Sequence, residues 1–185
     1  AVLWTHDHAD HCHGIDDLRV MRYGRSNALP GFASDATVSR LKRRFDYVFE
    51  GQHGYPTLCE IKPLEMRLVA GFSLDWVEMP HGPTMSTGFR LEADGHAIVY
   101  ATDFSAITEG MVACFAGADL IVCDCLRREP HPTHAHLAMA LELKARTRAR
   151  KMILTHLDKS MDHAALSAEV PKGVAVGYDG LEWLS

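Results

Sequence analysis

The sequence contains few of the features that place a protein in a membrane or on a nucleic acid. None of its apolar runs approaches the roughly 20 residues that a membrane span needs, and no secretory signal is visible. It also has no internal repeat and no low-complexity segment. The net charge of -5 argues against a protein built mainly to bind nucleic acid. We interpret the short basic run Arg40–Arg44 as the solvated face of a helix.

Cysteine is scarce and odd in number. Only five cysteines occur, and Cys123 and Cys125 flank an aspartate in an apolar run that is typical of a strand. The two side chains therefore share a face, and we expect them to be buried rather than bridged by a disulfide. Reduced thiols indicate a cytoplasmic protein.

The remaining composition is that of one globular domain. Apolar residues make up 47% of the 185 residues and charged residues 23%, which is ordinary for a folded domain with a substantial core. We therefore expect a single domain over residues 1–185. The chain does not begin with methionine and opens inside a predicted strand, so we also expect that an N-terminal part is missing from the sequence.

Strand-like and helical patterns alternate along the chain, which predicts a mixed α/β class. Short apolar runs predict strands at Val2–Trp4, Phe72–Met79, Gly88–Leu91, Ala97–Ala101, Leu120–Cys123, Met152–Thr155 and Val174–Val176. Amphipathic patterns predict helices at Ile15–Arg22, Asp35–Phe45, Ile107–Phe115, Leu137–Arg148 and His163–Glu169, with Ser34 or Asp35 capping the second. Gly and Pro at turn-forming intervals predict a loop over residues 50–63.

One stretch is dense in side chains that bind metals. "WTHDHADHCHG", residues 4–14, holds four histidines and two aspartates between a predicted strand and a predicted helix. In an extended chain, residues two apart point the same way, so His6 and His8 could hold one ion together. Asp10 and His11 follow at the helix entry and aim elsewhere, which favours two adjacent ions. Imidazole and carboxylate ligands suit zinc, manganese or iron.

Three further ligand-type residues come directly after apolar strands. His81 lies in "EMPHGP", Asp103 in "YATDFS" and His156 in "ILTHLD". Each alone is more typical of a hydrogen-bonded loop or a helix cap. Their repeated placement after strands, together with the first cluster, predicts a metal site.

These motifs resemble those of the metallo-β-lactamase superfamily. "THDHADHCHG" is similar to the first motif of that family, and "PHG", "TD" and "LTH" follow in the family's order. The resemblance implies that one metal takes His6, His8 and His81. It implies that the other takes Asp10, His11 and His156, with Asp103 bridging both. It also implies a four-layered αββα sandwich. Because the family has further strands before the first motif, we expect this chain to lack the N-terminal strands of that sandwich.

Four short motifs resemble one subgroup of that superfamily. "HGIDDLR", "PHPTH", "LTH" and "YDGL" are similar to motifs of the cyclic-phosphate phosphodiesterases of phosphonate breakdown, which are related to the tRNA 3′-processing endonucleases. The resemblance implies hydrolysis of a small cyclic phosphate or a cyclic nucleotide with two Zn²⁺ or Mn²⁺ ions and a bridging hydroxide. One departure is Lys159, where the subgroup often has a histidine. The extra structural zinc of some members would lie upstream of this chain.

Two other hydrolase classes remain as alternatives. A tRNA 3′-processing endonuclease would have a long arm rich in Gly, Pro and Lys to hold the tRNA, and no segment has that composition. A thioester hydrolase of the glyoxalase II kind would have a "GHTPGH"-like segment where this chain has "PHGPTMSTGF". The oligomeric state is left open, with a homodimer among the alternatives.

The resemblance and the chemistry together assign roles beyond metal binding. Asp10 and Asp103 would hold the attacking hydroxide and accept its proton. His134 is the best candidate to assist the leaving oxygen, with His131 and His136 as competitors; a helix-entry loop is the plainer interpretation of all three. Ligating imidazoles usually donate their second N–H to a carboxylate, for which Asp17 (or Asp16) and Asp179 are candidates, although "YDGL" is also typical of a simple turn.

Overall fold

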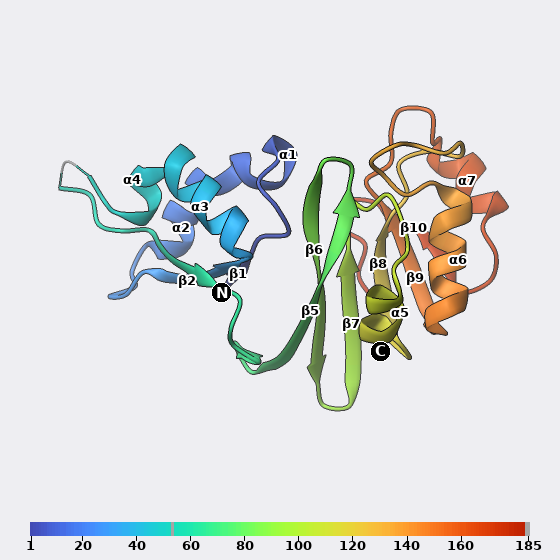
Figure 1. The fold of residues 1–185 in the computed structure, drawn as a ribbon, viewed down its shortest axis with the longest axis horizontal. Helices are drawn as coiled ribbons and strands as arrows, with labels where there is room; N and C mark the ends of the chain where they lie inside the picture. Colours follow the sequence, from blue (N-terminus) through green and yellow to red (C-terminus); the bar gives the residue numbers. More distant parts are fainter. Residues whose placement is uncertain (53, 184–185) are drawn as a thin grey trace. The chain divides into compact units, whose positions relative to one another are not determined.

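The chain forms two compact units, residues 1–70 and 71–185. The structure, a computed structural model, describes residues 1–52 and 54–183. Each unit is described by itself (Figure 1). That residues 1–185 act as a single hydrolase domain stays a prediction.

The first unit is a small parallel sheet with helices. Its strands are β1 (Val2–Leu3), β2 (Leu29–Ala33) and β3 (Cys59–Pro63), in the order β1-β2-β3 and parallel throughout. The helical segments are α1 (Ala9–Cys12), the 3-10 helix η1 (His13–Asp17), α2 (Leu18–Arg22), α3 (Asp35–Arg44) and α4 (Asp46–Phe49). The short strand β4 (Leu68–Val69) ends this part of the chain.

The core of the first unit depends on one glycine in β2. Gly31 pairs with Ile61 of β3, and the position of its missing side chain faces the Trp4 ring. A Cβ atom at this position would come within 2.6 Å of both the Trp4 ring and Cys59 Sγ. Trp4 is buried and packs edge-on against Phe49 at 6.1 Å. A larger residue at position 31 would therefore push this tryptophan out of the core.

Helix α3 is capped and anchored as its sequence predicts. Ser34 is the N-cap, and its hydroxyl accepts a hydrogen bond from the Thr37 amide at 3.3 Å. Leu41 and Val38 are buried in the core of the first unit. The basic residues of Arg40–Arg44 are exposed, which confirms that this run is a solvated helix face.

The second unit is a mixed sheet whose strands follow the order β10-β9-β8-β7-β6-β5. The strands are β5 (Phe72–His81), β6 (Thr84–Ala93), β7 (His96–Ala101), β8 (Leu120–Asp124), β9 (Lys151–Thr155) and β10 (Val174–Val176). β5, β6 and β7 form an antiparallel meander, whereas β7 to β10 are parallel. The helices are α5 (Glu109–Phe115), α6 (Leu137–Thr147) and α7 (His163–Glu169).

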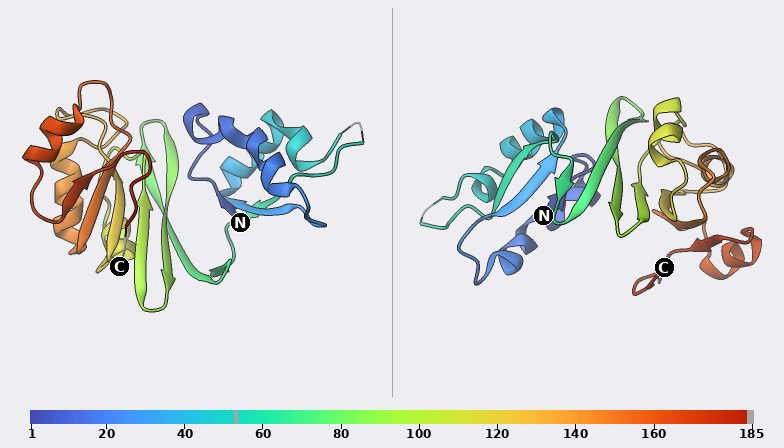
Figure 2. Two further views of the ribbon diagram at one scale, coloured as in Figure 1. Left: turned by 180° about the vertical axis from the view of Figure 1, so that it is seen from behind. Right: turned by 90° about the horizontal axis from the view of Figure 1, so that it is seen from below.

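The parallel strands of the second unit pack against its helices (Figure 2). One cluster joins buried strand residues such as Ile121 and Leu154 to Phe115 of α5, Leu143 of α6 and Leu166 of α7. Connections between parallel strands need crossovers, and these helices supply them. The core therefore fixes the carboxyl ends of the parallel strands relative to one another.

The predicted burial of Cys123 and Cys125 is confirmed. None of the five cysteines forms a disulfide, and Cys123 and Cys125 are both buried in the core of the second unit. Burial raises the pKa of Cys59 and of Cys125 to about 12. These thiols are therefore core side chains rather than nucleophiles.

Most predicted elements are present, with two corrections. The loop predicted over residues 50–63 is wrong at its end, where Cys59–Pro63 forms β3 with alternating buried and exposed residues. The helix predicted at Ile15–Arg22 begins as the 3-10 helix η1 and becomes α-helical only at Leu18. Across the described residues, no helix combines the length and apolar character of a membrane span. The compartment stays a prediction.

Candidate metal and catalytic site

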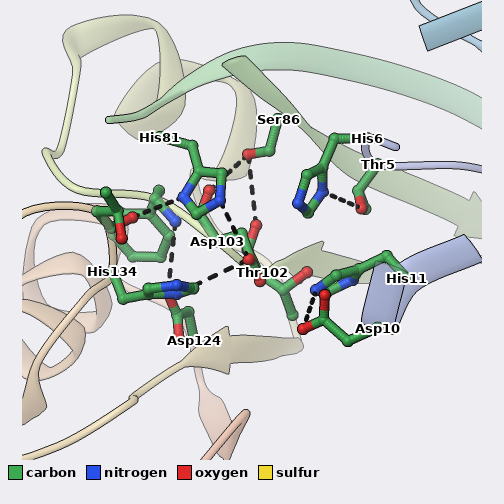
Figure 3. Close-up of polar contacts among 12 residues, drawn as sticks. Thr5, His6, Asp10, His11, His81, Ser86, Thr102, Asp103, Asp124 and His134 are labelled. Carbon is green, nitrogen blue, oxygen red and sulfur yellow. Dashed lines mark hydrogen bonds and ion pairs between the residues drawn. The ribbon is translucent and has the colours of Figure 1, made fainter. Parts of the chain in front are cut away.

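In the first unit, three of the four histidines of the first motif, His6, His8 and His11, lie together, and their role as metal ligands stays a prediction. The His6 ring lies 4.5 Å, centroid to centroid, from both the His8 and the His11 rings. His6 is 1% exposed, and its Nδ1 lies 3.0 Å from the Thr5 hydroxyl. Asp10 and His11 fall in α1, at the predicted helix entry, with Asp10 Oδ2 3.4 Å from His11 Nε2 (Figure 3).

In the second unit, the remaining candidates lie at one edge of the sheet. The parallel strands are in register, with Ala101 of β7 opposite Cys123 of β8, and Cys123 opposite Leu154 of β9. Residues that end or follow these strands therefore meet at their common carboxyl edge. Those residues are Asp103 after β7, Asp124 at the end of β8 and His156 after β9, and His81 ends β5.

Asp103 lies at the centre of this group. It is 1% exposed, its Oδ2 is 3.4 Å from His81 Nε2, and its Oδ1 is 3.5 Å from His156 Nε2. Ser86 Oγ donates a hydrogen bond of 2.7 Å to the Asp103 carbonyl, which fixes the backbone (Figure 3). The two carboxylate oxygens thus face different imidazoles, as a bridging ligand would. That Asp103 bridges two ions stays a prediction.

Two of the candidate ligands have unusual backbone angles. Asp103 has φ 62° and His156 has φ 60°, both in the left-handed region. Outside glycine this region costs about 1–2 kcal/mol per residue, and strain of this kind is concentrated at functional sites. The surrounding sheet holds both side chains in place at this cost, which favours a functional role for them.

His81 is oriented by the loop before α6. Its Nδ1 donates a hydrogen bond of 2.7 Å to the Thr133 carbonyl, leaving Nε2 with a lone pair. Gly82 has φ 60°, and a Cβ there would lie 2.5 Å from Thr133 Cγ2. The positive φ and the close approach of the Thr133 side chain therefore favour glycine in "PHG", beside the residue whose carbonyl holds the His81 ring.

Asp124 is a site residue that the sequence analysis missed. Its side chain is fully buried, and Oδ2 accepts hydrogen bonds from the Ala135 amide at 3.0 Å and the Phe104 amide at 3.4 Å. The same oxygen lies 3.2 Å from His134 Nδ1, and Oδ1 lies 3.7 Å from His156 Nδ1. Asp124 therefore ties the loop after β7, the loop before α6 and two histidines together.

Among the three competing histidines of "HPTHAH", His134 alone contacts both buried carboxylates in the described part of the chain. Its Nδ1 lies 3.2 Å from Asp124 and 3.7 Å from Asp103 Oδ2, and its ring stacks on His156 at 5.0 Å. His136 instead occupies the N-cap position of α6 without a side-chain cap bond.

His131 is poorly suited to donate a proton. Its Nδ1 accepts a hydrogen bond from the Thr133 amide at 3.3 Å, which requires an unprotonated nitrogen. Burial, and after it the charge of Arg127, lower the pKa of His131 below its ordinary value of 6.5. At neutral pH His131 is therefore mostly neutral, whereas a general acid must carry a proton.

The two carboxylates predicted to support the ligands are placed elsewhere. Asp17 is exposed in η1, and Asp179 is exposed in the turn after β10. Within residues 1–52 and 54–183, neither aspartate forms a hydrogen bond or an ion pair with a candidate histidine of its own unit. Asp179 does line a cavity of about 420 Å³ that also includes His156. That Asp17 and Asp179 support the ligands stays a prediction, whereas Asp124 and the Thr133 carbonyl are in contact with His134 and His81.

The donor set fits a divalent cation. In the second unit, the carboxylate oxygens of Asp103 lie 3.4 Å from His81 Nε2 and 3.5 Å from His156 Nε2. Asp103 is 1% exposed, and a buried carboxylate is typically paired with cationic groups or coordinated to a metal. Nitrogen and carboxylate donors of this kind suit Zn²⁺ or Mn²⁺.

The chain belongs to the metallo-β-lactamase superfamily. Residues 1–157 match the family described as the beta-lactamase superfamily domain. This confirms the resemblance seen in the motifs, and it confirms the mixed α/β fold class of that superfamily. Divalent metal ions are implied by this fold.

Solved structures of the same fold include three informative neighbours. A diphosphatase from the PhnP family is 29% identical, with a TM-score of 0.84 over 97% of this chain and 68% of that one. The metallo-β-lactamase fold protein YhfI from Bacillus subtilis is 22% identical, with a TM-score of 0.80 over 99% and 77% of the two chains. The short form of human tRNase Z is 17% identical, with a TM-score of 0.71 over 97% and 76%.

One curated relative is named for a different kind of activity, acyl transfer. An octanoyltransferase from Porphyromonas gingivalis (strain ATCC BAA-308 / W83) is 30% identical over 192 residues. The alignment covers 98% of this chain but 37% of the transferase, so the chain spans little more than a third of that protein's length.

Proposed function

We propose that this protein is a phosphodiesterase that uses two divalent metal ions. His6, His8 and His81 would hold one ion; Asp10, His11 and His156 would hold the other; Asp103 would be shared. The observation that carries the proposal lies within the second unit, where His134 contacts the buried carboxylates of Asp124 and Asp103 at 3.2 and 3.7 Å. An oriented imidazole beside candidate ligands is what cleavage of an ester with a poor leaving group requires.

The bound ions would supply a deprotonated water near neutral pH and charge neutralisation on the phosphate. The protein residues would do the rest. Asp103 and Asp10 would accept the proton of the attacking water. The Thr133 carbonyl and Asp124 would hold the rings of His81 and His134 in fixed orientations.

His134 would assist the leaving oxygen. Its Nδ1 faces Asp124, so its Nε2 is the atom that can present a proton to substrate. In this arrangement Asp124 fixes both the ring orientation and the tautomer of His134, as a carboxylate does for a catalytic histidine in other hydrolases. His134 acts as the acid and Asp124 as the residue that positions it.

The proposed substrate is a small phosphodiester, such as a cyclic phosphate or a nucleotide. The PhnP-family structure, 29% identical and described as a diphosphatase, supports hydrolysis of a phosphorus–oxygen bond. The likeness to tRNase Z is one of fold alone at 17% identity, and the net charge of -5 disfavours a tRNA substrate. The name of the octanoyltransferase supports acyl transfer only weakly, because the alignment with this chain covers 37% of that protein.

A panel of substrates separates these functions. The protein, reconstituted with Zn²⁺ or with Mn²⁺, is assayed on cyclic and linear phosphodiesters, a phosphomonoester and a thioester, and its metal content is measured. We expect two ions per chain and hydrolysis of a phosphodiester well above that of the monoester and the thioester. Thioester hydrolysis without phosphodiesterase activity would contradict the proposal, as would a metal-saturated protein with fewer than two ions.

Metal binding should weaken in acid. Ligating histidines must be neutral, and their ordinary pKa is about 6.5, so protons compete with the metal as the pH falls through about 6. Affinity and activity at limiting metal should therefore be constant above pH 7 and fall below pH 6. Titration of Zn²⁺ at pH 8, 7, 6 and 5 measures this. Equal affinities at pH 8 and pH 5 would be inconsistent with histidine ligands.

A further inference from the structure

Asp7 is the residue of the first motif that faces away from the candidate ligands. It lies between His6 and His8 in an extended segment, so its side chain points to the opposite side from theirs. Its carboxylate is only 14% exposed. A charged group so well covered must have partners, and both of them come from α3.

Two arginines of α3 hold Asp7. Arg40 Nη1 lies 3.0 Å from Asp7 Oδ1, and Arg44 Nη1 lies 3.3 Å from Oδ2. These arginines are four residues apart, so they stand on one face of the helix. Arg44 Nη1 also donates to the Asp7 backbone carbonyl. Both the side chain and the backbone of the motif are therefore attached to α3.

The second nitrogen of Arg44 reaches the far side of α1. Arg44 Nη2 lies 3.0 Å from His13 Nε2. Asp7 precedes α1 and His13 follows it, so one guanidinium holds both ends of the four-residue helix that carries Asp10 and His11. A helix of one turn has little stability of its own, and its position depends on such contacts.

We propose that Arg44, through Asp7 and His13, is a positioning residue for the metal-binding segment of the first unit. The inference rests on the proposed metal-binding function of His6, His8, Asp10 and His11. The ion pairs themselves are partly exposed, with Arg44 at 34%, so they add little to folding. Their effect is on the placement of α1 relative to the extended residues before it.

An effect of the Arg44 charge and an effect of Arg44 on ligand position predict opposite changes in metal affinity when its guanidinium is removed. If the guanidinium acted only through its charge, its removal would strengthen the binding of a cation. If it positions the ligands, its removal weakens binding. For Asp7 both effects weaken binding, so Arg44 is the informative residue. Arg43 is the matched control, because it is the neighbouring exposed arginine of α3 and its removal changes the net charge equally.

The experiment measures Zn²⁺ affinity by competition with a chelating dye for the full chain and for Arg44→Ala, Arg44→Lys, Asp7→Ala, Asp7→Ala/Arg44→Ala and Arg43→Ala. Circular dichroism and thermal unfolding without metal accompany it. We expect Arg44→Ala and Asp7→Ala each to bind about 10- to 100-fold more weakly, as for other supports of metal ligands. The double variant should be little worse than either single one, because the two residues act together.

The variant Arg44→Lys and the control Arg43→Ala distinguish a positioning role of Arg44 from an effect of its charge. Arg44→Lys keeps the charge but lacks the fork that spans Asp7 and His13, so it should lose affinity as well. Arg43→Ala should bind as the parent does. Unchanged or tighter binding by Arg44→Ala and Arg44→Lys would overturn the positioning role while leaving the proposed function intact. A parent protein that binds no Zn²⁺ would overturn both.

Discussion

Replacement of Asp103 by alanine is expected to cost both metal and turnover. The carboxylate lies 3.4 to 3.7 Å from His81, His134 and His156, so it is placed to be shared between ligand groups. Loss of a shared anionic ligand leaves two cations facing each other and should release at least one. Since bound metals contribute several kcal/mol to such a reaction, turnover should fall by about 10³-fold or more. Metal content and kcat, measured on the same preparation, test this.

Two further variants separate the ligand from the backbone. Asp103 has φ 62°, where alanine is strained, so Asp103→Ala will also destabilise the fold. Asp94 has φ 52° in the exposed turn after β6, and Asp94→Ala is the control for that strain. Asp103→Asn keeps the size of the side chain and tolerates the left-handed angle while removing the charge. Full metal content in Asp103→Asn and Asp103→Ala would contradict the assignment of Asp103 as a shared ligand.

His134→Ala should lose turnover while keeping both ions. Asp124 keeps its two amide donors, from Phe104 and Ala135, so the variant should retain the buried carboxylate in place. General acid catalysis is typically worth about 10²–10⁴-fold, and kcat should fall by that amount. The loss should shrink for a substrate with a nitrophenolate leaving group, which needs no proton. Rates on substrates of graded leaving-group pKa test this.

His136→Ala is the matched control for that experiment. His136 lies two residues away and caps no amide of α6 with its side chain. It should keep most of the activity. Metal loss in His134→Ala would make His134 a ligand rather than an acid. An equal defect on good and poor leaving groups would remove the acid role, and His131 would be tested next.

The ligand positions were predicted from the geometry of parallel strands, whose carboxyl ends lie at the same edge of a sheet. Polar residues directly after apolar strands must meet at one edge, and Asp103 and His156 do so. The same rule could have found Asp124, which ends the run "LIVCD". Its signal in the sequence is weak, because the cysteines on either side are typical of a buried strand and a single aspartate at a strand end is typical of a cap.

The strands of the first unit were harder to predict. β2 reads "LPGFA", in which proline and glycine weaken the strand pattern, and only the tight packing of Trp4 over Gly31 explains the glycine. β3 lies in a segment rich in turn residues, and its pairing with β2 is not encoded in its own sequence. The fold class was predictable from local pattern, whereas these strands depend on contacts between residues distant in the chain.

The left-handed φ angles of Asp103 and His156 lower the free energy of unfolding of the protein. Glycine at either position would relax the turn, at the expense of a more flexible unfolded chain, and would delete a candidate ligand. The two turns at this sheet edge thus reduce the stability of the fold but place candidate ligands at the site, which is a trade-off between stability and activity. A laboratory selection that rewarded only thermal stability would therefore change these two turns early, and the most stable descendants of this chain would be inactive.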